Sequence, residues 1–392
     1  MPSPSEEHPG LFIRDPYKYS DAMLIIPPLL VETLQNFDGE HTDLDLKLAL
    51  SRATNSLDVS ELQQHLTQTL SAAGFLEDEV FEQIRRERRN EFAASPLREA
   101  AHAGTAYPDN PDECRETMVR YMSDAPVSNF DGNLLGLAAP HVSPEGGWES
   151  YRAAYSVLRP EHSDKTFVIL ATSHYGEPER FGLTRKNFTT PLGEAQADRP
   201  LIDWLANRGG AAVSMEDYCF SFEHTVEFQV LFLQHVLGPD VKILPVLCGS
   251  FARSLYQGGD PEDDDGVKRF FDALGELHGR ERDKLVWVLG VDMAHMGARY
   301  GDSFEAFANE GRMNEVGARD NSRMERINAG DAAGFWDLVR ENRDDLKWCG
   351  SAPFYTFLKS IPNVRGELLK YEQWNIDDRS VVSFAGMAFN RS

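Results

Sequence analysis

The sequence predicts a layered α/β domain with a largely parallel central sheet, preceded by a small helical, winged-helix-like module. The first observation is a set of four short, continuous apolar runs: LLGLAAP, TFVILAT, VKILPVLCG and KLVWVLGVD. Runs of this length and composition are typical of parallel strands buried on both faces. The second observation is that helical patterns, such as residues 224–237, separate these runs. Alternating strands and helices favour the α/β architecture.

The domain boundaries follow from length and charge. At 392 residues the chain exceeds the usual size of one domain, so we expect more than one compact unit. Residues 77–91 are rich in charged side chains, which is typical of a solvated linker helix, and Pro96 ends that segment. We therefore place a helical module at residues 22–76, a linker helix at 77–96 and the α/β domain at 97–392.

The first two helices of the module are read from apolar spacing and helix breakers. Apolar residues recur at helical intervals from Leu29 to Phe37, and the Asp-Gly pair at 38–39 stops the pattern. A second helix follows from Thr42.

The third helix of the module is predicted to begin at Ser60. The Ser60 hydroxyl would cap the backbone while Gln63 reaches back, and Gly74 would end the helix. Phe75-Leu76 is then expected to begin an extended segment. This order of helices, together with IIPPLLVETLQNFDGEHT and LQQHLTQTLSAAGFLED, resembles PqqD-like peptide-recognition modules, which implies a peptide ligand. A plain three-helix structural appendage is the alternative.

Composition excludes several function classes. The 63 acidic and 39 basic residues give a formal net charge of −24, which repels a phosphate backbone, so no nucleic-acid partner is expected. The sequence contains neither a membrane-length apolar stretch nor the basic and apolar regions of a signal peptide, so we expect no membrane partner and a cytoplasmic location.

Histidines follow three of the predicted strands. His141 ends LLGLAAPH, His174 follows TFVILAT, and Asp292 and His295 end the longest apolar run. Functional side chains gather at the carboxyl edge of a parallel sheet. One histidine in a loop is usually an ordinary polar residue, but three at equivalent strand ends favour a metal site. A carboxylate behind an imidazole fixes its tautomer, which is the role expected of Asp292 and Glu223.

Cys349 is the candidate sulfur ligand. It lies in a turn before a predicted helix, in DLKWCGSAPFYTFL, where the helix dipole would favour the thiolate that a metal requires. A buried structural cysteine is the alternative, and we favour that interpretation for Cys114, Cys219 and Cys248. The four cysteines form no CxxC pair, so reduced thiols are expected rather than a disulfide framework or zinc knuckle.

Nine blocks of the C-terminal domain resemble the Memo family, of the type known as protein B of the AmmeMemoRadiSam system. In order they are REAAHAGTAYP, GLAAPHVS, VILATSHYGE, TTPLGEAQAD, FEHTVEFQV, ILPVLCGS, VLGVDMAHMG, CGSAPFYTFL and VVSFAGMAF. The resemblance implies a fold like that of class III extradiol dioxygenases. It also implies one metal, held by the histidines of the APH and SH blocks and the cysteine of the CG block. These residues are His141, His174 and Cys349.

The resemblance further implies a set of catalytic residues around the metal. His295 and Asp292 of the DMAH block, with Glu223 and His224 of the FEHTVE block, would line the same pocket. The chain also departs from the family pattern, because Gln229 and Tyr175 stand where histidines are usual. Both departures remove groups that could bind a metal or move a proton.

Two functions fit the sequence. The first is a non-haem, metal-dependent redox enzyme or oxygenase. Two histidines and a thiolate differ from the two-histidine, one-carboxylate set of many iron oxygenases; we expect iron or copper, with zinc as a third candidate. The second is a non-catalytic metal-binding scaffold or adaptor. The resemblance implies radical S-adenosylmethionine enzymes and AMMECR-family proteins as its partners.

Overall fold

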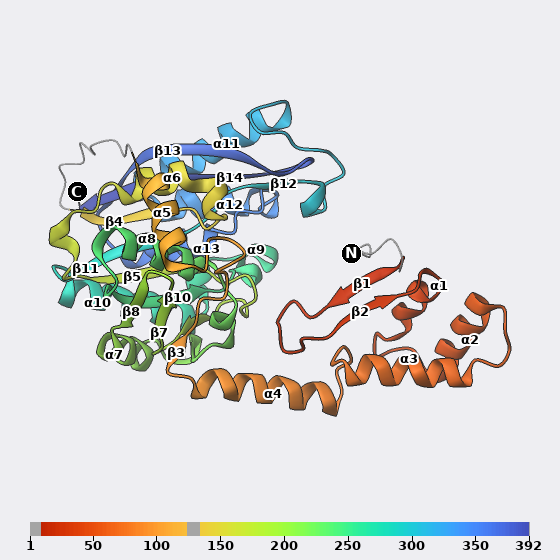
Figure 1. Ribbon diagram of the computed structural model, residues 1–392. Helices are drawn as coiled ribbons and strands as arrows, with labels where there is room; N and C mark the ends of the chain where they lie inside the picture. The colour runs from red at the N-terminus through yellow and green to blue at the C-terminus, as the bar shows by residue number, and fades with distance from the viewer. Residues whose placement is uncertain (1–8, 124–133, 392) are drawn as a thin grey trace. The chain divides into compact units, whose positions relative to one another are not determined.

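The computed structural model describes residues 9–123 and 134–391. The chain divides into two compact units, one ending at Ala94 and the other beginning at Ser95. Each unit has its own elements (Figure 1) and its own core. Among the described residues, no helix is long and apolar enough to cross a membrane.

The N-terminal unit is a two-stranded hairpin followed by helices. Its antiparallel strands are β1 (Leu11–Arg14) and β2 (Met23–Ile26). The helices are α1 (Pro28–Val31), which continues into a 3-10 turn at Glu32–Asn36, then α2 (Asp43–Thr54), α3 (Ser60–Ala72) and α4 (Glu79–Ala94). They enclose a small apolar core made of Ile26, Leu46, Leu50, Val59, Leu66 and Leu70.

The caps of α2 and α3 show where local sequence rules hold and where they fail. Thr42 caps α2 in a reciprocal box with Asp45, which confirms the predicted start. The predicted cap at Ser60 is wrong: Val59 is the N-cap residue of α3 and no side chain caps it. Gln63 is buried, and its side chain donates to the Asp43 carbonyl oxygen at 3.3 Å. Because Gln63 makes this tertiary contact, its side chain does not form the predicted capping box with Ser60.

The extended segment predicted at Phe75-Leu76 is also wrong. Gly74 ends α3 with a positive φ of 73°, and the next two residues form no strand. Phe75 and Leu76 pack instead against the apolar core of the unit. The unit's strands lie before its helices, in LFIR and MLII, and each is only four residues long. The first of them, LFIR, precedes the predicted module boundary at residue 22.

Helix α4, the predicted linker helix, is attached to the N-terminal unit by polar contacts. Arg88 Nε donates to the Tyr19 carbonyl oxygen at 3.1 Å, and Arg88 also pairs with Asp21. The guanidinium of Arg89 lies 5.7 Å from the centre of the Tyr19 ring. None of the side chains of α4 is fully buried, so the helix keeps the solvated character that its charge pattern indicates.

The C-terminal unit is built on a large sheet whose centre is parallel, as predicted. The four apolar runs form neighbouring strands in the order β4 (Leu134–Ala139), β11 (Leu285–Gly290), β5 (Thr166–Thr172) and β10 (Lys242–Cys248), and all three pairings are parallel. Nearly every residue in these strands is buried, which explains the continuous apolar runs.

Antiparallel and short strands extend the sheet on both sides. On the β4 side, β14 (Ser380–Arg391) pairs with β4, and β13 (Val364–Asp377) and β12 (His295–Gly297) pair with β14. The remaining strands are β3 (Leu97–Arg98), β6 (Phe181–Leu183), β7 (Asn187–Thr190), β8 (Gly193–Ala197) and β9 (Val213–Met215).

Helices cover the central sheet and fix the loops that follow its strands. Helices α6 (Pro144–Tyr155) and α8 (Thr225–Leu237) contact each other as well as the sheet. Helix α13 (Ser351–Ser360) contacts β5, β10, β11 and helix α10 (Asp265–Glu281). The other helices are α5 (Pro111–Met122), α7 (Arg199–Gly209), α9 (Ala252–Gln257), α11 (Arg312–Asn328) and α12 (Ala332–Arg340).

We predict that residues 95–392 fold without the N-terminal unit, because the two cores share no residue. The fragment should begin at Ser95, whose carbonyl oxygen accepts from Lys186 Nζ. Thermal melts followed by circular dichroism should show a cooperative transition close to that of the whole chain. A fragment of residues 105–392, which also lacks Arg98, should melt well below it. An insoluble or non-cooperative 95–392 fragment would show that the N-terminal unit completes the core.

Candidate metal centre

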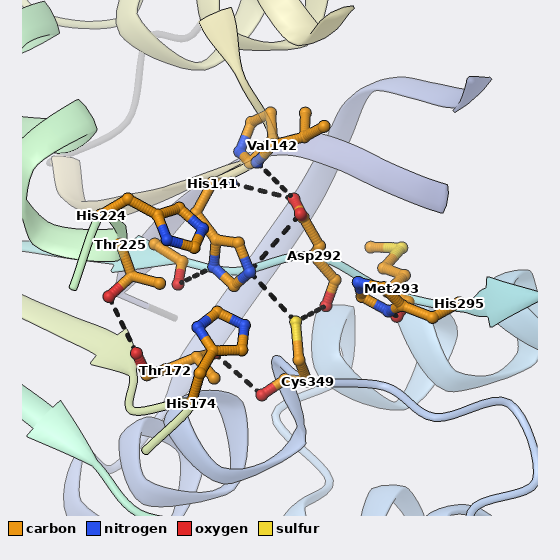
Figure 2. A network of polar contacts seen from close by, with 12 residues as sticks. His141, Val142, Thr172, His174, His224, Thr225, Asp292, Met293, His295 and Cys349 are labelled. Atoms are coloured by element: carbon orange, nitrogen blue, oxygen red, sulfur yellow. Dashed lines mark hydrogen bonds and ion pairs between the residues drawn. The ribbon is translucent and has the colours of Figure 1, made fainter. Parts of the chain in front are cut away.

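The predicted site residues come from loops at one edge of the central sheet (Figure 2). His141 follows β4, His174 follows β5 and Asp292 follows β11, while Cys349 lies in the turn before α13. Because β4, β11 and β5 are neighbouring parallel strands, their carboxyl ends meet at the same edge. This topology brings together side chains that lie up to about two hundred residues apart in the chain.

Two donor atoms lie in direct contact at the centre of the site. Cys349 Sγ is 3.1 Å from His141 Nε2 and 3.7 Å from the Asp292 carbonyl oxygen. The rings of His141 and His174 meet edge to face, with centroids 5.0 Å apart. Cys349 also interacts with His174. The structure thus places all three predicted ligands together.

Hydrogen bonds fix the tautomer of His141. Its Nδ1 donates to the Gly290 carbonyl oxygen at 3.0 Å, which leaves the lone pair of the neutral ring on Nε2, facing Cys349. Asp292 Oδ1 accepts from the backbone N–H groups of His141 and Val142 at 2.9 and 3.2 Å. Asp292 therefore positions the loop that carries His141, as a supporting carboxylate would.

Glu223 performs the same task for His174. The buried Glu223 carboxylate accepts from His174 Nδ1 at 3.0 Å and from the His174 backbone N–H at 2.8 Å. With Nδ1 engaged, the second ring nitrogen of His174 is the one available to a metal. Glu223 lies just before α8, so this helix connects the site to the sheet through its own packing.

The resemblance found in the sequence places His224 among the catalytic residues. In the structure, His224 also joins the candidate ligands. One ring nitrogen each from His141, His174 and His224 lie within 4.8 Å of one another. His224 stacks on His174 with an interplanar angle of 12° and centroids 5.1 Å apart, and its Nδ1 lies 3.2 Å from Glu223. The three-histidine group offers an alternative to the Cys349 set.

His295 lies at the margin of the site. Its Nδ1 bonds the carbonyl oxygens of Met293 and Lys347 at 2.9 and 3.1 Å, and its ring meets Tyr300 edge to face. Figure 2 draws it beside Met293, on the side of Asp292 away from His224. Burial lowers the pKa of His295, and the negative charge of Asp292 opposes that shift.

The electrostatics of the site favour a thiolate next to a charged imidazole. Burial raises the pKa of the Cys349 thiol, but His141 and His174 outweigh burial and lower that pKa below its usual value. Burial also works against a charged His174, yet Glu223 and Cys349 raise the pKa of His174 well above its usual value. Burial works against a charged Glu223 as well, but His174 and His224 hold the pKa of Glu223 well below its usual value.

The two departures from the family pattern have different surroundings. Gln229 is fully buried; its Nε2 donates to the Pro140 carbonyl oxygen at 2.8 Å, and its Oε1 accepts from the Tyr155 hydroxyl at 2.8 Å. It therefore holds the residue before His141. Tyr175 is 38% exposed, and its ring packs against Phe222 with centroids 4.9 Å apart.

Helix α11 contributes supporting residues that sequence reasoning missed. The buried Asp320 accepts hydrogen bonds, each 2.7 Å long, from Trp348 Nε1, the Tyr371 hydroxyl and the Ser383 hydroxyl. Trp348 precedes Cys349, and Ser383 Oγ in turn accepts from the backbone N–H of Ala294. Asp320 thus anchors two loops of the site at once. Its contacts are spread over more than sixty residues, so no local motif signals them.

The donor set fits a first-row transition metal. Thiolate and imidazole are ligands of iron, copper and zinc, and both imidazoles present a nitrogen whose partner nitrogen is already engaged. Ligands at 2.0–2.3 Å from one ion lie roughly 3.3–3.8 Å apart. The 3.1 Å between Cys349 Sγ and His141 Nε2 is close to that separation.

Comparison with known proteins gives the family. The family model described as Memo-like protein matches residues 98–388, which include every residue of the candidate site. A MEMO1 family protein of Aquifex aeolicus is 25% identical over 382 residues, covering 96% of this chain and 95% of that protein. A MEMO1 family protein of Thermococcus kodakarensis is 28% identical, covering 75% of this chain and 100% of that protein. A MEMO1 family protein of Methanosarcina barkeri is 25% identical, covering 74% of this chain and 99% of that protein. Because the family model spans well over half of the sequence, the chain belongs to the Memo-like family.

Proposed function

We propose that this protein binds one first-row transition metal through His141, His174 and Cys349 and acts as a metal-dependent redox enzyme or oxygenase on a small substrate. The observation that carries the proposal is that each candidate histidine ligand has one ring nitrogen held by a hydrogen bond, which leaves its other nitrogen for the metal. The Cys349 sulfur meets His141 Nε2, while the other nitrogen of His141 and Nδ1 of His174 are held by the Gly290 carbonyl and Glu223. A site of fixed tautomers around a thiolate is what a transition metal requires.

The donor types set the range of metals. A thiolate with two imidazoles suits copper, zinc or iron, and His224 stands beside them as a further nitrogen donor. Iron or copper is the proposal for redox chemistry, because zinc has no accessible second oxidation state. When bound, such an ion supplies Lewis acidity and electron transfer to a coordinated molecule.

The protein's own groups supply positioning and proton transfer. Glu223 holds both His174 and His224, so it fixes one donor and one proton-carrying ring with a single carboxylate. We assign the proton-transfer role to His224, whose side chain is 29% exposed and can exchange protons with solvent. Asp292 keeps the His141 loop in place, and His295 is the second candidate for moving a proton.

A non-catalytic metal-binding scaffold is the second candidate. It is favoured by the N-terminal unit, which exposes large apolar side chains, including Leu57 at 98%, Leu44 at 73% and Met23 at 67%. For this second candidate we propose that these side chains take part in the contact with a partner, because a contiguous apolar patch marks an interaction surface. The partners in this case would be radical S-adenosylmethionine and AMMECR-family proteins, with a peptide contacting the N-terminal unit.

The test combines metal analysis with a supporting-residue variant. Protein purified without oxygen should contain about one iron or copper per chain, and Glu223→Gln should lower metal affinity about 10- to 100-fold because His174 loses its orienting carboxylate. Glu216→Gln is the matched control, since Glu216 is a partly buried carboxylate that bonds Thr184 at 2.6 Å outside the site.

Oxygen uptake separates the two candidate functions. Metal-loaded enzyme should consume oxygen when a substrate is supplied, and the Glu223→Gln variant should not. Protein that retains its metal but shows no oxygen-dependent change in the metal spectrum, and that co-purifies with a partner, would favour the scaffold. Protein with no bound transition metal, and with unchanged metal affinity in Glu223→Gln, would contradict both.

A further inference from the structure

A cavity of about 310 Å³ opens beside the candidate metal centre, on the side of Cys349 and His174. Its walls come from the end of β5, the segment after β10, helices α9 and α12, and the loop that leads into α13. The exposed residues Ser250 and Tyr256 are part of the lining, which places the opening of the cavity near α9. Figure 2 shows that His174 and Cys349 point toward the same centre, so both the cavity and the donor set use these two side chains.

The body of the cavity is apolar. Trp336, Trp348, Leu255 and Val339 line it. The Trp348 Nε1–H donates to Asp320 at 2.7 Å and the Trp336 Nε1–H donates to the Gly259 carbonyl oxygen at 3.3 Å. Because both indole N–H groups are engaged elsewhere, these tryptophans present carbon atoms to the cavity. Such walls favour a flat apolar molecule.

Two buried hydroxyls in the wall, those of Ser173 and Ser351, make no hydrogen bond to a described residue. Ser351, at the start of α13, is 8% exposed, and its hydroxyl makes no hydrogen bond to any residue in the ranges 9–123 and 134–391. Buried hydroxyls are usually hydrogen-bonded, so an unpartnered one in the wall of a cavity calls for an explanation. A ligand in the cavity, which Ser351 lines, provides that partner.

The charge of the wall selects against ionic ligands. Asp344 lines the cavity, but Arg323 Nη1 bonds its Oδ1 at 2.7 Å, and Arg323 itself is buried. Apart from the metal-site groups, the described lining residues therefore offer no unpaired charge. Away from the metal-site groups, an anion would meet the Asp344 carboxylate.

We propose that this cavity binds an uncharged, flat, largely aromatic molecule of one or two rings, with one hydrogen-bonding group that pairs with Ser351 Oγ. The volume corresponds to about ten water molecules and lies at the small end of ligand pockets. The edge of the bound molecule lies next to Cys349 and His174, so the cavity is the substrate pocket of the metal centre. That last assignment rests on the proposed function, whereas binding itself does not.

Calorimetric titration with indole tests the proposal. Indole is uncharged and bicyclic, and it carries one N–H that can donate to Ser351 Oγ. We expect a Kd on the order of 0.1–1 mM for so small a ligand, and much weaker binding of the indole-3-acetate anion. Ser351→Ala should weaken indole binding about 2- to 10-fold through the lost hydrogen bond. Ser360→Ala is the control, because Ser360 lies on the same helix with an equally unpartnered buried hydroxyl outside the lining.

A second pair of variants keeps the test independent of Ser351. Leu255→Trp fills the cavity from the α9 side and should abolish indole binding. Leu201→Trp on α7 is the control, since Leu201 is also a partly buried residue against the same core but does not line the cavity. Indole that fails to bind the folded parent protein, or that binds Leu255→Trp as well as the parent, overturns the proposal.

Titrations with and without metal distinguish this proposal from the proposed function. Indole binding to chelator-treated protein that never takes up a transition metal leaves the cavity assignment standing and removes the metal function. Metal uptake without indole binding leaves the metal function standing and removes the cavity assignment. If both hold, indole should shift the visible or paramagnetic spectrum of the bound metal in the parent but not in Leu255→Trp.

Discussion

Cys349→Ser should remove most of the bound metal, lowering affinity by more than about 100-fold. The expectation exceeds the 10- to 100-fold effect of losing a supporting residue because this change removes a ligand itself. A neutral hydroxyl replaces a charged, soft sulfur donor that His141 and His174 hold toward the thiolate form, with a pKa below the usual value despite burial. Metal content after equal dialysis of parent and variant measures the loss.

Cys248→Ser is the matched control for that experiment. Cys248 ends β10 and is 1% exposed, and burial raises the pKa of its thiol above the usual value, as expected for a packed, protonated cysteine. The serine variant should keep its metal and lose roughly 1 kcal/mol of unfolding free energy. If Cys349→Ser retains as much metal as the parent, the ligand set must be rebuilt on the three histidines His141, His174 and His224.

Arg98→Met should lower the free energy of unfolding by about 3–5 kcal/mol, because it leaves a buried carboxylate without its counter-ion. Arg98 and Glu227 form an ion pair in which both side chains are at most 1% exposed. Glu227 also accepts from the backbone N–H groups of Ala101 and His102, each at 3.0 Å, and from the Tyr107 hydroxyl. This one carboxylate therefore fastens the first segment of the C-terminal unit to α8.

The ion pair also touches the metal centre. Arg98 Nη2 donates to the Glu223 carbonyl oxygen at 2.7 Å, so its loss should loosen the residue that orients His174. Urea unfolding curves of Arg98→Met, Glu227→Met and the double variant test the pair. The double variant should cost less than the sum of the two single variants, since no unpaired charge remains. Arg85→Met, which breaks an exposed pair with Glu82 on α4, should cost at most about 1 kcal/mol. Equal losses of unfolding free energy in Arg98→Met and Arg85→Met would contradict the stabilising role assigned to the buried Arg98–Glu227 pair.

The pH dependence of stability provides an independent check on Glu227. Burial raises the pKa of Glu227, but Arg98 and the Tyr107 hydroxyl outweigh burial and lower that pKa below 4.5. A carboxylate whose pKa is lowered on folding stabilises the protein above its unfolded pKa and loses that contribution as the pH falls through the folded value. The parent should therefore lose stability more steeply than Glu227→Gln below about pH 4.5.

Much of the C-terminal fold could be read from the sequence because its central strands are buried on both faces. That environment forces continuous apolar runs, so TFVILAT and KLVWVLGVD became β5 and β11 with parallel pairing. The N-terminal unit gave a weaker signal. Its hairpin strands are four residues long, too short for a clear periodicity, and the Ser60 cap failed because Gln63 makes a tertiary contact instead.

By itself, the sequence determined the parallel sheet and the placing of His141, His174 and Cys349 beside its strand and helix ends, because strand burial and helix starts leave local patterns. Only the tertiary structure decided which groups surround them. It stacked His224 on His174, turned Gln229 toward Pro140, and set Asp320 beneath Trp348. These contacts join residues that are tens of positions or more apart, and a contact across space depends on how layers pack rather than on any property of the neighbouring sequence.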